Sequence, residues 1–242
     1  MNSFSDIHCH LLPGVDDGAK DIADAMEMLA IAYEDGIRTI VFTPHYRGRY
    51  KKNTPEQLRK VFFQLRQCAA EAFPDMRLYL GQEIAYEQDA PSALQEQRTL
   101  TLGDSDYCLL EFSPDALGSR ILSGVAETLR YGYWPIVAHA ERCTALRKDP
   151  SLVDEILHMG GFIQLNADSV MGRWGFRVKH FCGKLLKEEK AHFIATDAHD
   201  AKDRPPKLCD CWQKVSKKYG NEYAARLFES NVRAVTENEP IE

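Results

Sequence analysis

The sequence predicts an α/β fold in which seven parallel strands alternate with helices and close as a TIM-like (β/α)7 barrel. Three observations lead to this prediction. Short apolar runs recur along the chain, longer amphipathic stretches separate them, and most of the runs end in histidines or carboxylic acids. A length of 242 residues suits one barrel or two small domains. Because the alternation continues without a low-complexity segment, we expect one domain spanning 1–242.

The predicted strands are short and rich in Ile, Val, Leu, Phe and Tyr, as buried parallel strands are. Each covers only five to seven residues. Such strands need a helical connection to run parallel in one sheet. They are Phe4–His8, Ile37–Thr43, Arg77–Gly81, Tyr107–Phe112, Trp134–His139, Phe162–Asn166 and His192–Thr196.

The predicted helices fill the intervals between these strands. Asp21–Glu34 carries an apolar stripe at helical spacing and is followed by Gly36. Pro55–Ala72 has Thr54 as its N-cap and a proline at the first helical position. Similar patterns predict Ser119–Tyr131, Ser151–Met159, Val178–Glu189, and two helices between residues 206 and 237 that split near Gly220.

The composition of the chain limits the cellular location and the binding partners that we expect for the protein. The formal net charge of -6 does not favour binding to nucleic acid or to an anionic membrane surface. No apolar run is long enough to span a bilayer, and the N-terminus lacks the pattern of a signal peptide. Seven cysteines without a CxxC pair argue against a disulfide framework. We therefore expect a cytoplasmic protein.

Residue types that bind metals follow nearly every predicted strand. The active sites of barrel enzymes lie at the C-terminal ends of the strands, so these side chains are expected to meet at one mouth. Imidazole and carboxylate together suit zinc, manganese or iron. The set comprises His8, His10, His45, Glu83, Glu111, His139, Asp197 and His199, with Asp16 and Asp17 on the loop after the first strand.

Each of these residues alone is a weak signal, because a single histidine is more often structural than a ligand. The alternative for the whole set is a series of unrelated polar strand ends. That alternative requires five histidines and three acids to stand at strand ends by accident. His158 and His180 fall within helices and His192 begins a strand, so we interpret these three as structural.

Six motifs carry a family resemblance: DIHCHLLPGVDDGA, TPH, GQEI, LLEF, AHAER and ATDAHD. In this order they resemble the polymerase and histidinol phosphatase (PHP) superfamily, and more narrowly its bacterial capsule-type tyrosine-protein phosphatases. The likeness runs from Asp6 to about Pro206. It implies a distorted seven-stranded (β/α) barrel with three divalent metal ions, with manganese as the expected metal and iron, zinc or magnesium as alternatives.

The resemblance also implies a role for each matching residue. The first metal takes His8, His10, Glu83 and Asp197; the second shares Glu83 and adds Glu111 and His139; the third takes Asp17, His45 and His199. Arg142 and Arg204 match the phosphate-binding arginines of the family. Two positions depart from its usual pattern, Ala140 in place of a proline and Tyr46 in place of a second histidine, and neither is an assigned ligand.

By resemblance, the function is hydrolysis of phosphotyrosine on a protein, with a membrane-associated tyrosine autokinase of capsule or exopolysaccharide synthesis as the expected substrate. The mechanism is metal-assisted in-line displacement at phosphorus. Two alternatives stay open: a small-molecule phosphatase such as a histidinol-phosphatase, and a non-catalytic metal-binding regulatory module. No cysteine has an arginine six residues later, which argues against a cysteine-based tyrosine phosphatase. The sequence leaves the oligomeric state open.

The densest basic run, from Tyr46 to Lys52, directly follows His45. One interpretation is a solvated loop. The other is a substrate-docking lip at the barrel mouth, where its charges attract a phosphopeptide and Tyr46 and Tyr50 pack on a phosphotyrosine ring.

Overall fold

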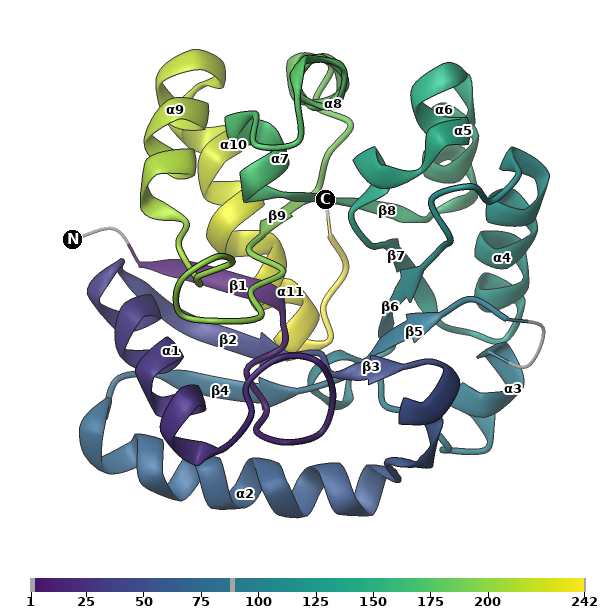
Figure 1. Ribbon diagram of the computed structural model, residues 1–242. Coiled ribbons are helices and arrows are strands. Elements are labelled where there is room, and N and C mark those ends of the chain that lie inside the picture. Colours follow the sequence, from purple (N-terminus) through teal and green to yellow (C-terminus); the bar gives the residue numbers. More distant parts are fainter. Residues whose placement is uncertain (1–2, 88–89, 242) are drawn as a thin grey trace.

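The computed structural model describes residues 3–87 and 90–241. Within these residues, all pairs of neighbouring strands are parallel, and the strands curl around a common centre (Figure 1). The strands are β1 (Phe4–Cys9), β2 (Ile37–Phe42), β3 (His45–Tyr46), β4 (Arg77–Leu80), β5 (Glu83–Ala85), β6 (Tyr107–Glu111), β7 (Trp134–Val137), β8 (Phe162–Asn166) and β9 (Phe193–Ala195).

The strand order follows the chain around the sheet. One group runs β1-β2-β4 and the other β3-β5-β6-β7-β8-β9. A parallel bridge between Cys9 and Ala198 joins β1 to the segment after β9, so the sheet curls back to its first strand. The predicted TIM-like α/β fold is confirmed.

Two of the seven predicted strands are interrupted. The second continues past Pro44 as β3, and the third continues past Gln82 as β5. The ladder carries on across both interruptions, because Gly81 N–H donates to Phe42 O at 2.8 Å and Glu83 N–H donates to Pro44 O at 3.2 Å. These short continuations carry His45 and Glu83 to the mouth of the barrel.

The five helices predicted between residues 21 and 189 are present, with ends shifted by at most two residues. A capping box fixes the start of α2, where Thr54 Oγ1 accepts from Gln57 N–H and the Gln57 side chain accepts from Thr54 N–H. The α-helices are α1 (Ile22–Glu34), α2 (Pro55–Ala72), α3 (Ala90–Gln95), α4 (Gly118–Arg130), α5 (Thr144–Lys148), α6 (Ser151–Met159), α7 (Ala167–Met171), α8 (Phe176–Lys187), α9 (Cys209–Tyr219), α10 (Asn221–Ala225) and α11 (Asn231–Glu237). Short 3-10 turns cover Gly48–Lys52, Leu102–Asp104 and Ala140–Arg142, and a π turn covers Arg226–Ser230.

An apolar cluster fills the space enclosed by the strands. Ile7, Val41 and Leu109 belong to it and are fully buried. Val232 and Val235 of α11 pack into the same cluster and close the end of the barrel where the strands begin. Chemistry is therefore confined to the opposite end, where the strands finish. Among the helices of the described residues, none has the length and apolarity that a membrane span requires.

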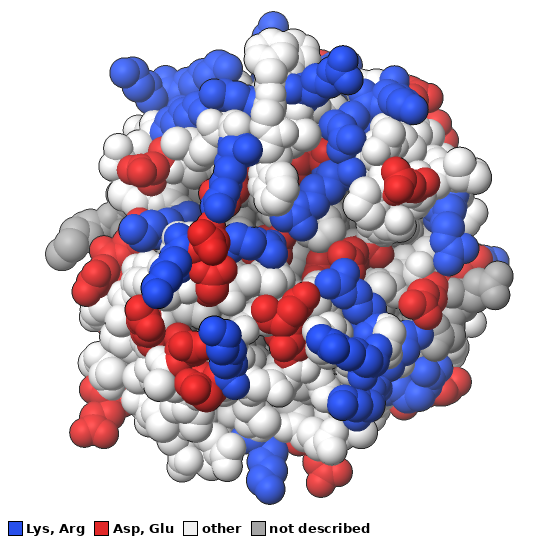
Figure 2. Space-filling view, in the orientation of Figure 1, with Lys and Arg blue, Asp and Glu red and all other residues white. Residues whose placement is uncertain are grey.

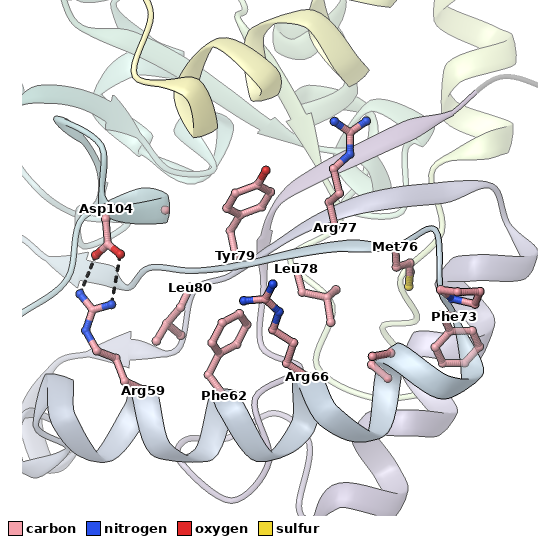
Figure 3. A pocket seen from close by; sticks show the side chains of 14 residues that line it. Arg59, Phe62, Arg66, Phe73, Met76, Arg77, Leu78, Tyr79, Leu80 and Asp104 are labelled. Atoms are coloured by element: carbon pink, nitrogen blue, oxygen red, sulfur yellow. Dashed lines mark hydrogen bonds and ion pairs between the residues drawn. The ribbon is translucent and has the colours of Figure 1, made fainter.

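A hollow of about 420 Å³ lies outside the sheet between α2 and β4 (Figure 3). Arg59, Arg66 and Arg77 line it, and Arg59 donates two hydrogen bonds to the carboxylate of Asp104. Arg77 is the first residue of β4, so the hollow lies toward the end of the barrel that α11 closes. Of the residues that the structure describes, no histidine or cysteine lines this hollow.

Candidate metal centre

The ends of six strands bring all nine predicted ligand residues together. His8, His10, Glu83 and Asp197 are almost completely buried, whereas the Asp17 side chain is 43% exposed. The structure places their ligand atoms in four overlapping groups whose atoms lie within 4.8 Å of one another. The groups are His10–Asp17–His45–His199, His8–His10–Asp197, His8–Glu83–His139 and His45–Glu83–Glu111. His158, His180 and His192 lie outside these groups, in agreement with their structural interpretation.

The ligand atoms of His8, His10 and Asp197 are spaced like three corners of a tetrahedral metal site, with Glu83 beside them. His8 Nε2 lies 3.3 Å from His10 Nε2, 3.4 Å from Glu83 Oε1 and 3.6 Å from Asp197 Oδ1. His10 Nε2 lies 3.5 Å from both Glu83 Oε2 and Asp197 Oδ1. Ligand atoms at about 2.0–2.2 Å from a tetrahedral ion stand about 3.3–3.6 Å apart. The ligand atoms of His8, His10 and Asp197 are therefore already spaced for one ion, and Glu83 approaches the two histidines through its two different oxygens.

Two further groups flank this set. His139 Nε2 lies 2.8 Å from Glu83 Oε1 and 3.9 Å from Glu111 Oε1 on one side. On the other side, Asp17 Oδ1 lies 3.2 Å from His45 Nε2 and 3.7 Å from His199 Nε2. Glu83 thus stands at the centre of the cluster, within reach of both the first set and the His139 side.

Three buried atoms of the cluster have no hydrogen-bond partner among the described residues: His45 Nδ1, Glu83 Oε2 and His139 Nδ1. The first two lie 2.7 Å apart without the alignment of a hydrogen bond. Buried polar groups without partners are rare in folded proteins, and such groups usually bind a water molecule or an ion. The donor set and these unsatisfied atoms fit divalent cations.

The charges of the cluster also indicate a site for divalent cations. Burial opposes protonation of His8, but the carboxylates of Glu83 and Asp197 outweigh it and raise the pKa of His8 to about 9. Burial likewise opposes protonation of His45, and its contacts with Asp17 and Glu83 raise its pKa to about 10. The carboxylates therefore draw positive charge into a buried space, which is the electrostatic requirement of a metal site.

A second layer of side chains orients the histidines. His8 Nδ1 donates to Gln164 Oε1 at 3.1 Å, and His10 Nδ1 donates to Asp16 Oδ2 at 2.7 Å. Gln164 Oε1 also accepts from the backbone N–H of His139 at 2.7 Å. When a metal displaces the proton from Nε2, these bonds hold the remaining imidazole proton on Nδ1 and direct the Nε2 lone pairs of His8 and His10 into the cluster.

Sequence reasoning missed Gln164 and Asn166, which end the sixth strand. Asn166 Nδ2 donates to Asp197 Oδ2 at 2.8 Å, and Gln164 Nε2 donates to Asn166 Oδ1 at 2.9 Å. The signal was available, since these two residues are two apart at a strand end, as His8 and His10 are. Amides are not typical metal ligands, so the pattern of strand ends did not include them.

The two predicted phosphate-binding arginines converge on one carboxylate oxygen. Arg142 Nη2 lies 3.0 Å and Arg204 Nη2 2.7 Å from Asp197 Oδ2, and Arg204 also donates to Asp197 O at 2.8 Å. Both guanidinium groups keep access to solvent, with side chains 29% and 28% exposed. Asp197 therefore connects the metal-ligand set, through Oδ1, to the arginines, through Oδ2.

Some side chains of the basic loop after His45 lie in the apolar core, and others contact the cluster of ligand residues. Tyr46 is buried in the apolar core and its hydroxyl accepts from Arg98, so the predicted packing of Tyr46 on a phosphotyrosine ring is wrong. Arg47 Nη1 lies 3.1 Å from both oxygens of Glu111. The ring of Tyr50 stacks on His45 with 6.0 Å between centroids.

A family model and a curated relative place the chain in the same protein family. Residues 4–237 match the model of the family described as capsular polysaccharide synthesis, CpsB/CapC. Over 235 residues the chain is 35% identical to the tyrosine-protein phosphatase CpsB of Streptococcus pneumoniae, covering 95% of this chain and 97% of that protein.

Solved structures extend the comparison. A structure from a study of YwqE from Bacillus subtilis and CpsB from Streptococcus pneumoniae, described as unique metal-dependent tyrosine phosphatases, superposes with a TM-score of 0.91 at 33% identity, covering 98% of this chain and 96% of that one. Histidinol phosphate phosphatase from Lactococcus lactis superposes with a TM-score of 0.62 at 14% identity, covering 90% and 95%. The second likeness is evidence of the fold alone.

Proposed function

This chain belongs to the CpsB/CapC capsular polysaccharide synthesis family, and we propose that its cluster at the strand ends holds three divalent ions. It is a metal-dependent tyrosine-protein phosphatase of the CpsB and YwqE type that takes part in capsular polysaccharide synthesis. The observation that carries the proposal is the close approach of the His8, His10 and Asp197 ligand atoms to one another, with Glu83 contacting both histidines.

The three ions divide the cluster as follows. The first is held by His8, His10, Glu83 and Asp197; the second by Glu83, Glu111 and His139; the third by Asp17, His45 and His199. Support comes from the four overlapping groups of ligand atoms and from the unsatisfied atoms of Glu83, His45 and His139. Manganese is the proposed metal on the strength of the family resemblance, and the mixed imidazole and carboxylate set without thiolate also suits iron or zinc.

Bound divalent ions supply Lewis-acid polarisation of a phosphoryl group and an activated water at neutral pH. The residues of this chain bind and orient the substrate. Arg142 and Arg204 are proposed to grip the non-bridging phosphate oxygens, since guanidinium groups match phosphate geometry bidentately. Asp197 accepts from both arginines, so it fixes the direction in which they present their free N–H groups.

The proposed substrate is phosphotyrosine on a membrane-associated tyrosine kinase of capsule or exopolysaccharide synthesis, with the phosphatase acting in the cytoplasm. The family description and the names of the relatives support a phosphotyrosine protein, and the kinase follows from the resemblance alone.

The test is a side-by-side assay with a phosphotyrosine peptide, a phosphoserine peptide and histidinol phosphate, using protein stripped of metal and reloaded with manganese, iron, zinc or magnesium. Elemental analysis should give about three ions per chain and activity should require them. Preference for histidinol phosphate would favour the small-molecule alternative. Bound metal without turnover of any substrate would favour the non-catalytic module.

Two variants sharpen the assignment. Glu111→Gln should lower the metal content by one ion while the Gln164-oriented His8 and His10 site stays filled. Arg142→Lys should leave the metal content unchanged and raise the Michaelis constant, since lysine keeps the charge but loses the bidentate geometry. Loss of metal in Arg142→Lys would contradict the proposed division of roles.

A further inference from the structure

A basic and aromatic cleft of about 580 Å³ lies between α5 and α8. Arg147 and Lys148 of α5 line one wall, and Arg177 and Lys184 of α8 line the other. No Asp or Glu is among the described residues that line it. This cleft is a local concentration of positive charge in a chain whose formal net charge is -6.

The cations of the cleft are available to a ligand. Lys148, Arg177 and Lys184 are exposed, and their side chains form no hydrogen bond or ion pair with the described residues. Arg147 is held in place, because its guanidinium donates to Glu141 O and to Thr144 Oγ1. Lys and Arg side chains gather along the upper edge of the molecule, around α8 and α9 (Figure 2).

Two aromatic groups give the cleft an apolar surface beside its charges. Phe176 is 80% exposed, the highest fraction among the exposed large hydrophobic side chains. Its ring stacks on His180 with 5.9 Å between centroids and an interplanar angle of 27°. A surface that combines an exposed aromatic ring with unpaired cations offers a peptide both apolar and charge contacts.

The walls of the cleft begin close to the arginine side of the proposed active site. The Arg142 guanidinium lies 5.3 Å from the centre of the Trp174 ring. One wall of the cleft, α5, begins two residues after Arg142, and the other wall, α8, begins two residues after Trp174. Two residues of extended chain span only about 7 Å. A peptide with its phosphate at Arg142 therefore reaches the cleft within a few residues.

The loop that carries Trp174 is anchored beside the second arginine. Arg173 Nη1 donates to the Asp168 carboxylate at 2.9 Å and to the backbone carbonyl of Asp203, the residue before Arg204. Trp174 is 51% exposed and so borders the path between the arginines and the cleft. These contacts hold the loop of Trp174 in place beside Arg204.

We propose that the cleft between α5 and α8 binds carboxylate side chains of the protein substrate that flank the phosphotyrosine. This inference rests on the proposed phosphatase function, which places the phosphate at Arg142 and Arg204. The concave shape suits an extended peptide better than a flat membrane surface, and the unpaired cations select acidic residues by charge complementarity. At about 3.3–3.6 Å per residue, the acidic residues lie roughly two to five positions from the phosphotyrosine.

The test compares three phosphotyrosine peptides of equal length: one with Asp and Glu on the N-terminal side, one with them on the C-terminal side, and one with Asn and Gln instead. Wild-type kcat/KM should favour one acidic peptide over the neutral peptide by roughly threefold to tenfold, since each exposed charge pair contributes a factor of about 1.4 to 5. The preference should shrink as salt rises.

The double variant Arg177→Ser with Lys184→Ser should abolish this preference and leave turnover of p-nitrophenyl phosphate, which has no flank, unchanged. The matched control is Arg66→Ser with Arg77→Ser, which removes the same charge from the hollow between α2 and β4 (Figure 3). The control should keep the preference. Equal rates for acidic and neutral peptides in the wild type, or equal losses in the two double variants, would overturn the proposal.

Binding separates this inference from the proposed function. Fluorescence anisotropy with non-hydrolysable phosphonate versions of the same peptides reports on the cleft even if turnover is absent. Absence of turnover on every phosphotyrosine substrate would refute the phosphatase function, while an acidic preference in binding that depends on Arg177 and Lys184 would still support the cleft. An anisotropy result without acidic preference would reject the cleft, whatever the turnover.

Discussion

Replacing Gln164 with Leu should weaken both the folded state and the metal site, although Gln164 is not itself a proposed ligand. Its Oε1 is the acceptor for two buried donors, the backbone N–H of His139 at 2.7 Å and Nδ1–H of His8 at 3.1 Å. Leucine fills a similar volume but accepts no hydrogen bond. The substitution therefore leaves both donors without a partner in a part of the barrel from which water is excluded.

The size of the effect follows from these two contacts. An unsatisfied buried donor costs about 1–3 kcal/mol, so the free energy of unfolding should fall by roughly 2–6 kcal/mol. Metal affinity should fall by roughly 10- to 100-fold, because the proton of His8 is no longer held on Nδ1 and Nε2 loses its preferred state for a metal.

Two measurements separate the effects. Urea unfolding of metal-free protein gives the loss of stability, and calorimetric titration with Mn²⁺ gives the loss of affinity. The matched control is Asn231→Leu, which deletes a buried amide whose Nδ2 donates to His192 O, at the opposite end of the barrel. The control should be less stable and bind Mn²⁺ normally. Wild-type Mn²⁺ affinity in Gln164→Leu would refute the orienting role of this side chain.

Three further predictions concern the metal and the pH. Chelation should abolish activity and lower Tm, because metal binds the folded state; a Tm that ignores the chelator would contradict a preformed site. Glu83→Ala should be among the most damaging ligand changes while His158→Ala stays nearly fully active, and equal activities would refute the site assignment. Burial lowers the pKa of His192 to about 4, so the unfolded chain binds the extra proton below about pH 6.5 and stability falls on acidification. Between pH 7 and 5 the wild type should lose about 1–2 kcal/mol more than His192→Gln, measured by urea unfolding, and parallel curves would reject this explanation.

The sequence was sufficient to predict the fold because its strongest pattern is a series of buried apolar runs. Apolar runs of five to seven residues can be satisfied only as strands covered on both sides, and the helices between them carry clear caps, such as Thr54. The interruptions of the second and third strands at Pro44 and Gln82 were not predicted. They depend on how the hydrogen bonds between strands resume after Pro44, which lacks an N–H, and after Gln82. These hydrogen bonds are a property of the tertiary structure.

The placement of Tyr46 could have been predicted from alternation. Successive residues of a strand point to opposite faces, so a strand that aims His45 at the cluster must aim Tyr46 at the core. The error came from interpreting residues 46–52 as one exposed loop. The hydrogen bonds of Gln164 to two histidines could not be predicted from the sequence. They join residues that lie far apart in the chain, His139 at 25 residues and His8 at 156 residues from Gln164.

Two of the proposed ligands have strained backbone. His139 and Asp197 have positive φ angles (31° and 52°), as do Gln97, Asp104, Glu189 and Asn238 outside the cluster. Such conformations cost about 1–3 kcal/mol each and persist where the surroundings impose them. Here the imposing contacts are identifiable: His139 N–H donates to Gln164 Oε1 at 2.7 Å, and Asp197 N–H donates to His8 O at 2.8 Å. Both contacts join a proposed ligand to a neighbouring strand, so the sheet holds these two side chains in place at the expense of local backbone energy.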